Sequence, residues 1–286
     1  MSAFAIVERG TRDRLGEGPL WSPRDNALYW VDILGCALNR FDLAGGGVTR
    51  WTLAEPIGWV IERAPGDGFI AGLQSGFAEL RLDPFTVTPF HDPEPDLPAN
   101  RMNDAKADDA GRIWAGTMPF DCEGASGGLY RLDPDRRVTR VDTGYTIANG
   151  PALMPGGEHL FHTDSKLGHV YRYRIADDGS LHDRSIFLDF ADSDGTPDGM
   201  TFDAEGGLWI ALWGAGRIER YAPDASLDRS IPLPAAQLTS CAFAGADLDR
   251  LFVTSAAEDD TASPHAGALF EVDAGVRGFA PRQFAS

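Results

Sequence analysis

Three short stretches of the sequence place an oxygen-bearing side chain directly before a glycine. They are EGP, NGP and DGM, which begin at Glu17, Asn149 and Asp198, and each leads into an apolar run. These side chains are hard oxygen donors, and the Glu and Asp carry negative charge, which is the donor set that a divalent cation prefers in proteins. If they converge, they predict a metal site with coordination positions left for water and substrate.

The same dipeptides also occur in ordinary turns, because Gly tolerates positive φ and Asn and Asp populate turns. A site is favoured because all three stand where an inner strand is expected to begin. Asp198 lies between Pro197, which restricts φ at its own position, and Gly199, which permits a sharp turn. Its carboxylate can therefore be aimed with little conformational freedom. We expect Asp198 to be both a metal ligand and the catalytic base that takes a proton from an attacking water.

Six short apolar runs recur along the chain at intervals of about 41 to 48 residues, with polar turns between them. They are LYWVD (28–32), FIAGL (69–73), IWAGT (113–117), LFHTD (160–164), LWIAL (208–212) and LFVTS (251–255). Another strand-like run follows each, and sustained helical periodicity is almost absent. Repeats of about four strands at this spacing are typical of propeller blades. The sequence therefore predicts an all-β, six-bladed β-propeller with a central metal site, in which residues 1–286 form one domain.

The innermost strand of each propeller blade lines the channel, so the starts of these strands meet at one end of the ring. The expected starts lie at Glu17, 56–59, 101–104, Asn149, Asp198 and 239–241. Ring closure usually joins strands from both ends of the chain. We therefore expect AFAIVERG, at 3–10, to pair with the blade that contains residues 239–280.

The motifs at these strand starts resemble those of one known family. The chain is similar, over essentially its whole length, to the gluconolactonase, senescence marker protein and luciferin-regenerating enzyme family of six-bladed propellers. The matching pieces are LGEGPLW with LYWVDI, NRMNDAKAD with GRIWAGTM, TIANGP, and PDGM. The resemblance implies that Glu17, Asn149 and Asp198 bind one divalent cation while Arg101 and Asn103 hold the substrate. It implies hydrolysis of sugar lactones to aldonic acids with Ca²⁺, Zn²⁺, Mn²⁺, Mg²⁺ or Fe²⁺, and leaves the sugar, its ring size and the metal open.

The residues around the expected site suit that chemistry. A bound cation can polarise a lactone carbonyl, and the donor fork of Arg101 suits ring hydroxyls or a developing carboxylate. Asn103 can both donate to and accept from sugar hydroxyls. The loop at 119–128, PFDCEGASGG, is glycine-rich and is expected beside the channel mouth, where it could act as a lid that brings Glu123 to the substrate. The alternatives are a surface salt bridge for Arg101, turn capping for Asn103 and a plain loop for Glu123.

Charge and composition exclude several classes of partner. Asp and Glu outnumber Lys and Arg by 43 to 25, giving a formal net charge of -18, which opposes binding to nucleic acid and to anionic membranes. No stretch approaches the roughly 18 apolar residues of a membrane span, and the first residues lack a secretory signal pattern. The three cysteines are widely separated, as expected of reduced thiols. We expect a cytoplasmic monomer.

Two other classes of function are compatible with a propeller. A propeller can serve only to bind a ligand or a protein, since a fold does not dictate a function, but the converging carboxylates disfavour this. A paraoxonase-like esterase or a metal-free strictosidine-synthase-like lyase is the other alternative, and the oxygen triad with the NRMND run favours the lactonase over both. The prediction is a hydrolase of carbohydrate metabolism that opens a pentono- or hexonolactone, such as xylono- or gluconolactone.

Overall fold

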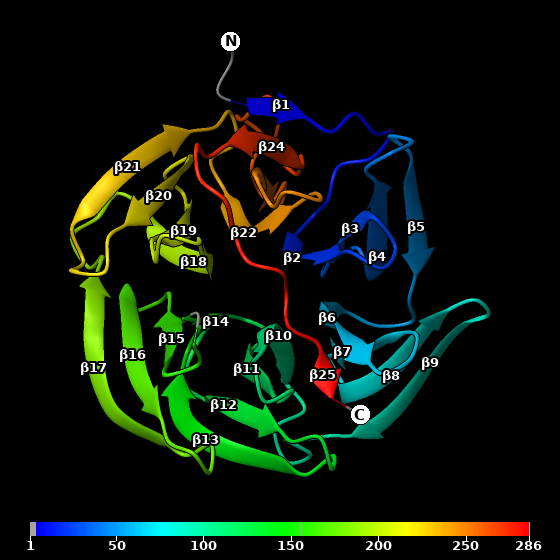
Figure 1. Ribbon diagram of the computed structural model, residues 1–286, viewed down its shortest axis with the longest axis vertical. Coiled ribbons are helices and arrows are strands. Elements are labelled where there is room, and N and C mark those ends of the chain that lie inside the picture. The colour runs from blue at the N-terminus through cyan, green and yellow to red at the C-terminus, as the bar shows by residue number, and fades with distance from the viewer. Residues whose placement is uncertain (1–3, 155, 286) are drawn as a thin grey trace.

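The computed structural model of the chain describes residues 4–154 and 156–285, and the regular structure in these ranges is β-strand throughout. The strands form six sheets that stand around a common centre, as Figure 1 shows in a view down the ring. The predicted all-β, six-bladed β-propeller is confirmed. No helix within the described ranges is long and apolar enough to cross a membrane.

The strands of each blade follow one another from the channel outward. The first blade comprises β2 (Gly16–Ser22), β3 (Ala27–Asp32), β4 (Ala37–Asp42) and β5 (Val48–Thr52). The second comprises β6 (Ile57–Ala64), β7 (Phe69–Leu73), β8 (Gly76–Leu82) and β9 (Phe85–His91). The third comprises β10 (Asn100–Ala107), β11 (Ile113–Pro119), β12 (Gly127–Leu132) and β13 (Val138–Tyr145).

The remaining blades repeat this order around the ring. The fourth comprises β14 (Ala148–Leu153), β15 (His159–Asp164), β16 (His169–Ile175) and β17 (Leu181–Asp189). The fifth comprises β18 (Thr196–Phe202), β19 (Leu208–Trp213), β20 (Arg217–Tyr221) and β21 (Leu227–Pro232). The sixth comprises β22 (Leu238–Ala244), β23 (Arg250–Ser255), β24 (Phe270–Asp273) and β1 (Phe4–Ile6).

The six apolar runs of the sequence form the second strand of each blade. Every residue of β3 and β7 is buried, whereas most residues of the outermost strand β9 are exposed. The second strands are covered on both faces by neighbouring blades, so their side chains are apolar on both faces and the runs are continuous rather than alternating. The outermost strands face water on one side and lack such runs.

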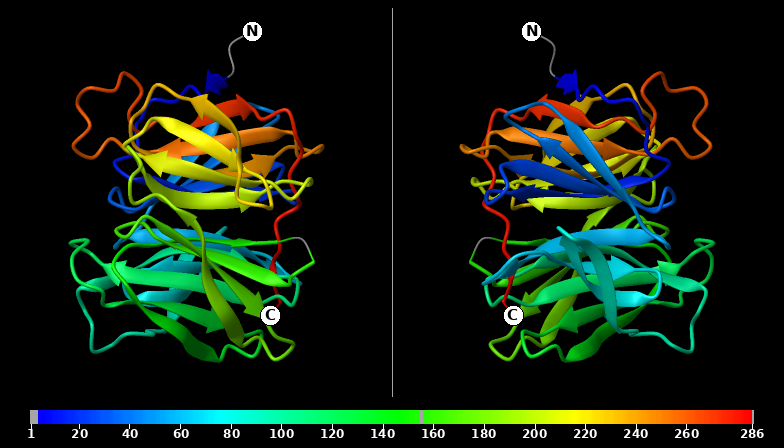
Figure 2. Two further views of the ribbon diagram at one scale, coloured as in Figure 1. Left: turned by 90° about the vertical axis from the view of Figure 1, so that its left-hand side faces the viewer. Right: turned by 90° about the vertical axis from the view of Figure 1, so that its right-hand side faces the viewer.

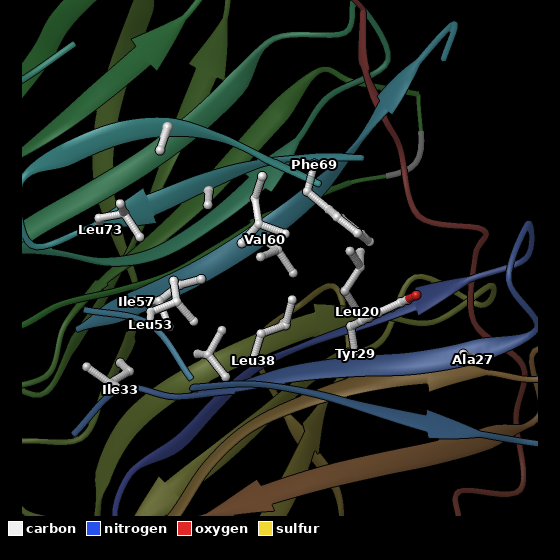
Figure 3. Close-up of a cluster of buried hydrophobic side chains, with 14 residues drawn as sticks. Leu20, Ala27, Tyr29, Ile33, Leu38, Leu53, Ile57, Val60, Phe69 and Leu73 are labelled. Carbon is white, nitrogen blue, oxygen red and sulfur yellow. The ribbon is translucent and has the colours of Figure 1, made fainter. Parts of the chain in front are cut away.

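Packing between neighbouring blades holds the ring together. Among the described residues, six clusters of buried hydrophobic side chains occur, and each combines residues from two adjacent blades. Figure 3 shows the cluster between the first two blades, where Leu20 and Leu38 meet Val60 and Phe69. Each buried side chain of this size contributes about 1.5 to 3 kcal/mol to stability. The core therefore lies between the blades and not at the channel mouth.

Both ends of the described chain contribute strands. β1 pairs antiparallel with β24, which confirms the predicted closure of the ring by the N-terminal segment. At the other end, β25 (Phe284–Ala285) pairs in parallel with the end of the inner strand β6, an arrangement that the sequence did not predict. The segment before β25 crosses the middle of the ring in Figure 1. Figure 2 shows that it runs along one face, opposite the loop between β23 and β24.

Every inner strand is interrupted near its beginning by a β-bulge or irregular pairing. The shifts in register fall at Glu17/Leu20, Ile57/Trp59, Met102/Ala105, Asn149/Ala152, Pro197/Met200 and Leu238/Ser240. A bulge bends its strand and turns a side chain away from the regular alternation, and bulges are over-represented next to active sites. The predicted site residues other than Glu123 lie at or beside these irregularities.

Candidate functional site

Glycines permit the sharp local backbone at the strand starts. Gly18 and Gly150 have φ values of +54° and +67°, in the left-handed region that other residues rarely adopt. Gly199 serves a different need, because a Cβ atom there would lie 2.2 Å from the side-chain oxygen of Ser240 in the next blade. The glycine after each predicted ligand therefore allows either a tight bulge or a close approach between blades.

The five predicted residues of the strand starts are all buried. Glu17 and Asn149 are each 4% exposed, Asp198 and Asn103 5%, and Arg101 6%. Three of them are ionisable, and burying a charge is costly unless it is paired or binds an ion. Their burial at one end of the channel therefore requires an explanation from their partners.

A continuous chain of hydrogen bonds links three of these side chains to the hydroxyl of Ser165. Arg101 Nη1 donates to Asn103 Oδ1 at 2.5 Å, and Asn103 Nδ2 donates to Asn149 Oδ1 at 2.7 Å. Asn149 Nδ2 donates to the hydroxyl of Ser165 at 2.9 Å, and that hydroxyl donates to the carbonyl of Pro197 at 2.6 Å. This chain joins the third, fourth and fifth blades. Sequence reasoning missed Ser165, whose turn carries no recognisable motif.

The carboxyl groups of three blades repel one another. Burial, and after it the charge of Asp104, raises the pKa of Glu17 from 4.5 to about 8. Burial raises the pKa of Asp104 from 3.8 to about 6. For Asp198, burial and then the charges of Glu17 and Asp104 raise the pKa well above its ordinary value of 3.8. Asp104 lies within a predicted strand start, but its sequence context indicates no role, and its neighbours become visible only in the folded ring.

The donor set fits a divalent cation. Within the described part of the chain, the buried atoms Asp198 Oδ1 and Asp104 Oδ2 have no hydrogen-bond partner. Mutually repelling carboxylates with unpaired oxygens are stabilised when a cation lies among them. In residues 4–154 and 156–285, no three His, Cys, Asp or Glu side chains are grouped closely enough to hold a metal by themselves. The predicted site would thus depend on the amide oxygen of Asn149 as well as on Glu17 and Asp198.

A small cavity lies in the channel behind the site. It has a volume of about 90 Å³, and its lining includes Trp59, Lys106 and Met200 from the inner strands. Phe279 and Pro281 of the C-terminal segment line it at the other end. The segment that crosses the ring therefore closes the channel on the side away from the predicted ligands.

The loop expected to act as a lid does lie beside the predicted site. The guanidinium carbon of Arg101 lies 5.6 Å from the ring centre of Phe120, at the start of this loop. Glu123, which the sequence predicted to bind substrate, is exposed, and its carboxylate pairs with Lys166 Nζ at 3.0 Å. The substrate-binding role of Glu123 stays a prediction, as do the roles of the other predicted site residues.

Comparison with known proteins agrees with the architecture and the motifs. Residues 15–257 match the family model described as the SMP-30/Gluconolactonase/LRE-like region. The chain belongs to this family. The pentonolactonase XacC of Haloferax volcanii is 36% identical, with 97% of this chain and 96% of that protein covered. The L-arabinolactonase of Azospirillum brasilense is 34% identical, with 98% and 95% covered. The crystal structure of regucalcin from Agrobacterium tumefaciens, described as a calcium-binding protein, has a TM-score of 0.93 at 30% identity, with 99% and 98% covered.

Proposed function

We propose that this protein is a metal-dependent sugar lactonase that hydrolyses a pentono- or hexonolactone to the corresponding aldonic acid. The observation that carries the proposal is the buried group of Glu17, Asn149 and Asp198, which lies beside the hydrogen-bonded pair Arg101 and Asn103. Family relatives that are named sugar lactonases support the reaction class. The ligand set and the substrate residues are part of the proposal.

In this proposal Glu17, Asn149 and Asp198 hold one divalent cation. The cation supplies Lewis-acid polarisation of the lactone carbonyl and lowers the pKa of the Asp198 carboxyl, so that this group is ionised. Asp198 Oδ1, which is buried and has no partner in the described structure, is the atom available to accept a proton from water.

The hydrolysis adds one water across the ester bond. The water oxygen bonds to the carbonyl carbon while its proton passes to Asp198, then the bond between that carbon and the ring oxygen breaks. The ring oxygen takes up the proton and becomes a hydroxyl, and the product is a hydroxy acid. Arg101 has a buried Nε without a hydrogen-bond partner in the described residues, so it retains donor capacity for a sugar hydroxyl or the product carboxylate.

The test is acid release from a panel of pentono- and hexonolactones. The protein is first freed of metal by chelation, and Ca²⁺, Zn²⁺, Mn²⁺, Mg²⁺ and Fe²⁺ are then added back singly. We expect no release above the spontaneous rate after chelation and recovery with at least one metal. Full activity after chelation would overturn the metal dependence, and absence of release with every lactone and metal would overturn the lactonase. An aryl ester in the same assay identifies a paraoxonase-like esterase.

A further inference from the structure

The hydroxyl of Ser165 lies between two of the predicted ligand segments. Ser165 is 5% exposed and belongs to the turn that follows β15. Its oxygen accepts a hydrogen bond from Asn149 Nδ2 at 2.9 Å and donates one to the carbonyl of Pro197, the residue before Asp198, at 2.6 Å. One side chain thus touches the asparagine of the fourth blade and the backbone that carries the aspartate of the fifth.

The hydrogen-bond chain that passes through this hydroxyl has only one possible direction. It begins at Arg101, whose guanidinium can only donate, and it ends at a backbone carbonyl, which can only accept. Each amide between these ends must therefore accept on the Arg101 side and donate on the Ser165 side. For Asn149 this means that Nδ2 faces Ser165 and that Oδ1, the atom able to bind a cation, accepts the hydrogen bond from Asn103.

The backbone of Ser165 is held independently of its hydroxyl. Its N–H donates to the carbonyl of Ile147 at 2.9 Å. The carboxylate of the preceding Asp164 accepts the N–H groups of Thr146 and Ile147 at 3.1 and 3.3 Å. Removing the hydroxyl should therefore leave the turn in place, so an effect on the site can be separated from an effect on the fold.

We propose that Ser165 is a positioning residue that fixes the amide of Asn149 with its oxygen toward the metal and ties that amide to the backbone of Asp198. Without the hydroxyl, Asn149 Nδ2 loses its acceptor, and the hydrogen bond from Asn103 Nδ2 is the remaining contact that holds the amide oxygen in place. Because hydrogen-bond partners of metal ligands typically alter metal affinity by about 10- to 100-fold, the loss should lie in that range. This inference rests on the proposed function, since it presupposes metal binding at Asn149.

The experiment compares three variants of the full chain with the wild type. Ser165→Ala removes the hydroxyl, and Ser165→Thr keeps it. Ser22→Ala is the matched control, because the Ser22 hydroxyl is also buried and also makes two hydrogen bonds, to Glu62 and from the N–H of Asp25, at the other end of β2. The dissociation constant of Mn²⁺ or Ca²⁺ is measured by calorimetry on chelator-treated protein, and the melting temperature is measured on the same metal-free samples.

We expect Ser165→Ala to weaken metal binding by about 10- to 100-fold with an unchanged melting temperature in the metal-free state. Ser165→Thr should recover most of the affinity, and Ser22→Ala should bind metal as the wild type does. If Ser165→Ala binds as tightly as Ser22→Ala, or if it melts well below that control, the positioning role is wrong while the lactonase proposal stands. If the wild type itself binds no divalent cation, both proposals fail, and that result is distinct from a failure of the variant alone.

Discussion

Asp198 and Asp203 lie near the two ends of the same inner strand, β18, and their surroundings are opposite. Asp203 is fully buried, yet its oxygens accept two backbone N–H groups, the indole of Trp209 at 2.7 Å and the guanidinium of Arg220 at 2.6 Å. Burial alone would raise the pKa of Asp203, but these partners outweigh it and lower that pKa. Asp198 has a raised pKa and, within the described structure, an oxygen without a partner.

The same contrast recurs on β10. Beyond the end of this strand, Asp108 accepts the indole of Trp114 at 2.8 Å and the guanidinium of Arg112 at 2.6 Å. In the middle of the strand, Asp104 has the buried Oδ2 that has no hydrogen-bond partner within the described structure. Carboxylates at the far end of the strands therefore hold turns together, whereas those at the mouth are left available for a ligand. The residue type is the same, and the partners decide which purpose it serves.

The largest expected effect is a loss of stability when Asp203, at the end of β18 away from the channel mouth, is replaced. Asp203→Ala should lower the free energy of unfolding by about 3 kcal/mol, because Arg220 would lose its buried partner. Asp228→Ala is the matched control, because it removes a half-exposed partner of the same arginine and should cost less than about 1 kcal/mol. Urea unfolding monitored by circular dichroism measures both. If both variants lose the same free energy of unfolding, the buried carboxylate of Asp203 stabilises the fold no more than the exposed one of Asp228.

Asp198→Asn tests the proposed role of the carboxylate at the channel mouth. We expect lactone hydrolysis at saturating metal to fall by at least about a hundredfold, because the variant lacks charge and basicity, while metal still binds at high concentration. The fold should be at least as stable as the wild type without metal, because a repelled carboxylate is gone. Asp194→Asn, in the exposed turn before β18, should change neither quantity. If saturating metal restores the wild-type kcat, Asp198 is a ligand only and another group is the base.

Arg101→Ala should lower kcat/KM by roughly 10- to 150-fold, the cost of losing a charge-assisted hydrogen bond to substrate. Asn103→Ala should act in the same direction. In Arg101→Ala, which does not contact Asn149 directly, the metal content measured by elemental analysis after dialysis should stay near that of the wild type. A change below about twofold would assign Arg101 to the structure of the mouth, where its guanidinium also contacts Phe120.

Per pH unit, the smallest expected effect is the pH dependence of the stability of the metal-free fold. Between pH 4.5 and about 8 the unfolded chain has released the Glu17 proton while the folded chain retains it. Stability should therefore fall as pH rises through this window, by at most about 1.4 kcal/mol per pH unit for this group. Glu17→Gln should flatten the slope, and so should added metal in the wild type. If the free energy of unfolding changes with pH equally in the wild type and in Glu17→Gln, then Glu17 is not the group that stays protonated in the folded chain.

Much of the molecule could be predicted from the sequence because the information is local and repeated. The six apolar runs form the second strands, since a strand covered on both faces must be mostly apolar. The glycines after Glu17 and Asn149 have positive φ, and the dipeptides Glu-Gly and Asn-Gly are enough to predict such a turn. Closure by the N-terminal segment also followed from the repeat. One domain, a monomer and a cytoplasmic location stay predictions.

The composition of the mouth was decided only by the tertiary structure. Asp104 joins the carboxyl cluster, Ser165 contacts Asn149 and Pro197, and Glu123 turns toward Lys166, although nothing near these residues in sequence indicates such partners. The reason is geometric. The neighbours of a side chain at a bulge come from strands of the adjoining blades. These strands lie tens of residues away in sequence, and only the packing between blades brings them together.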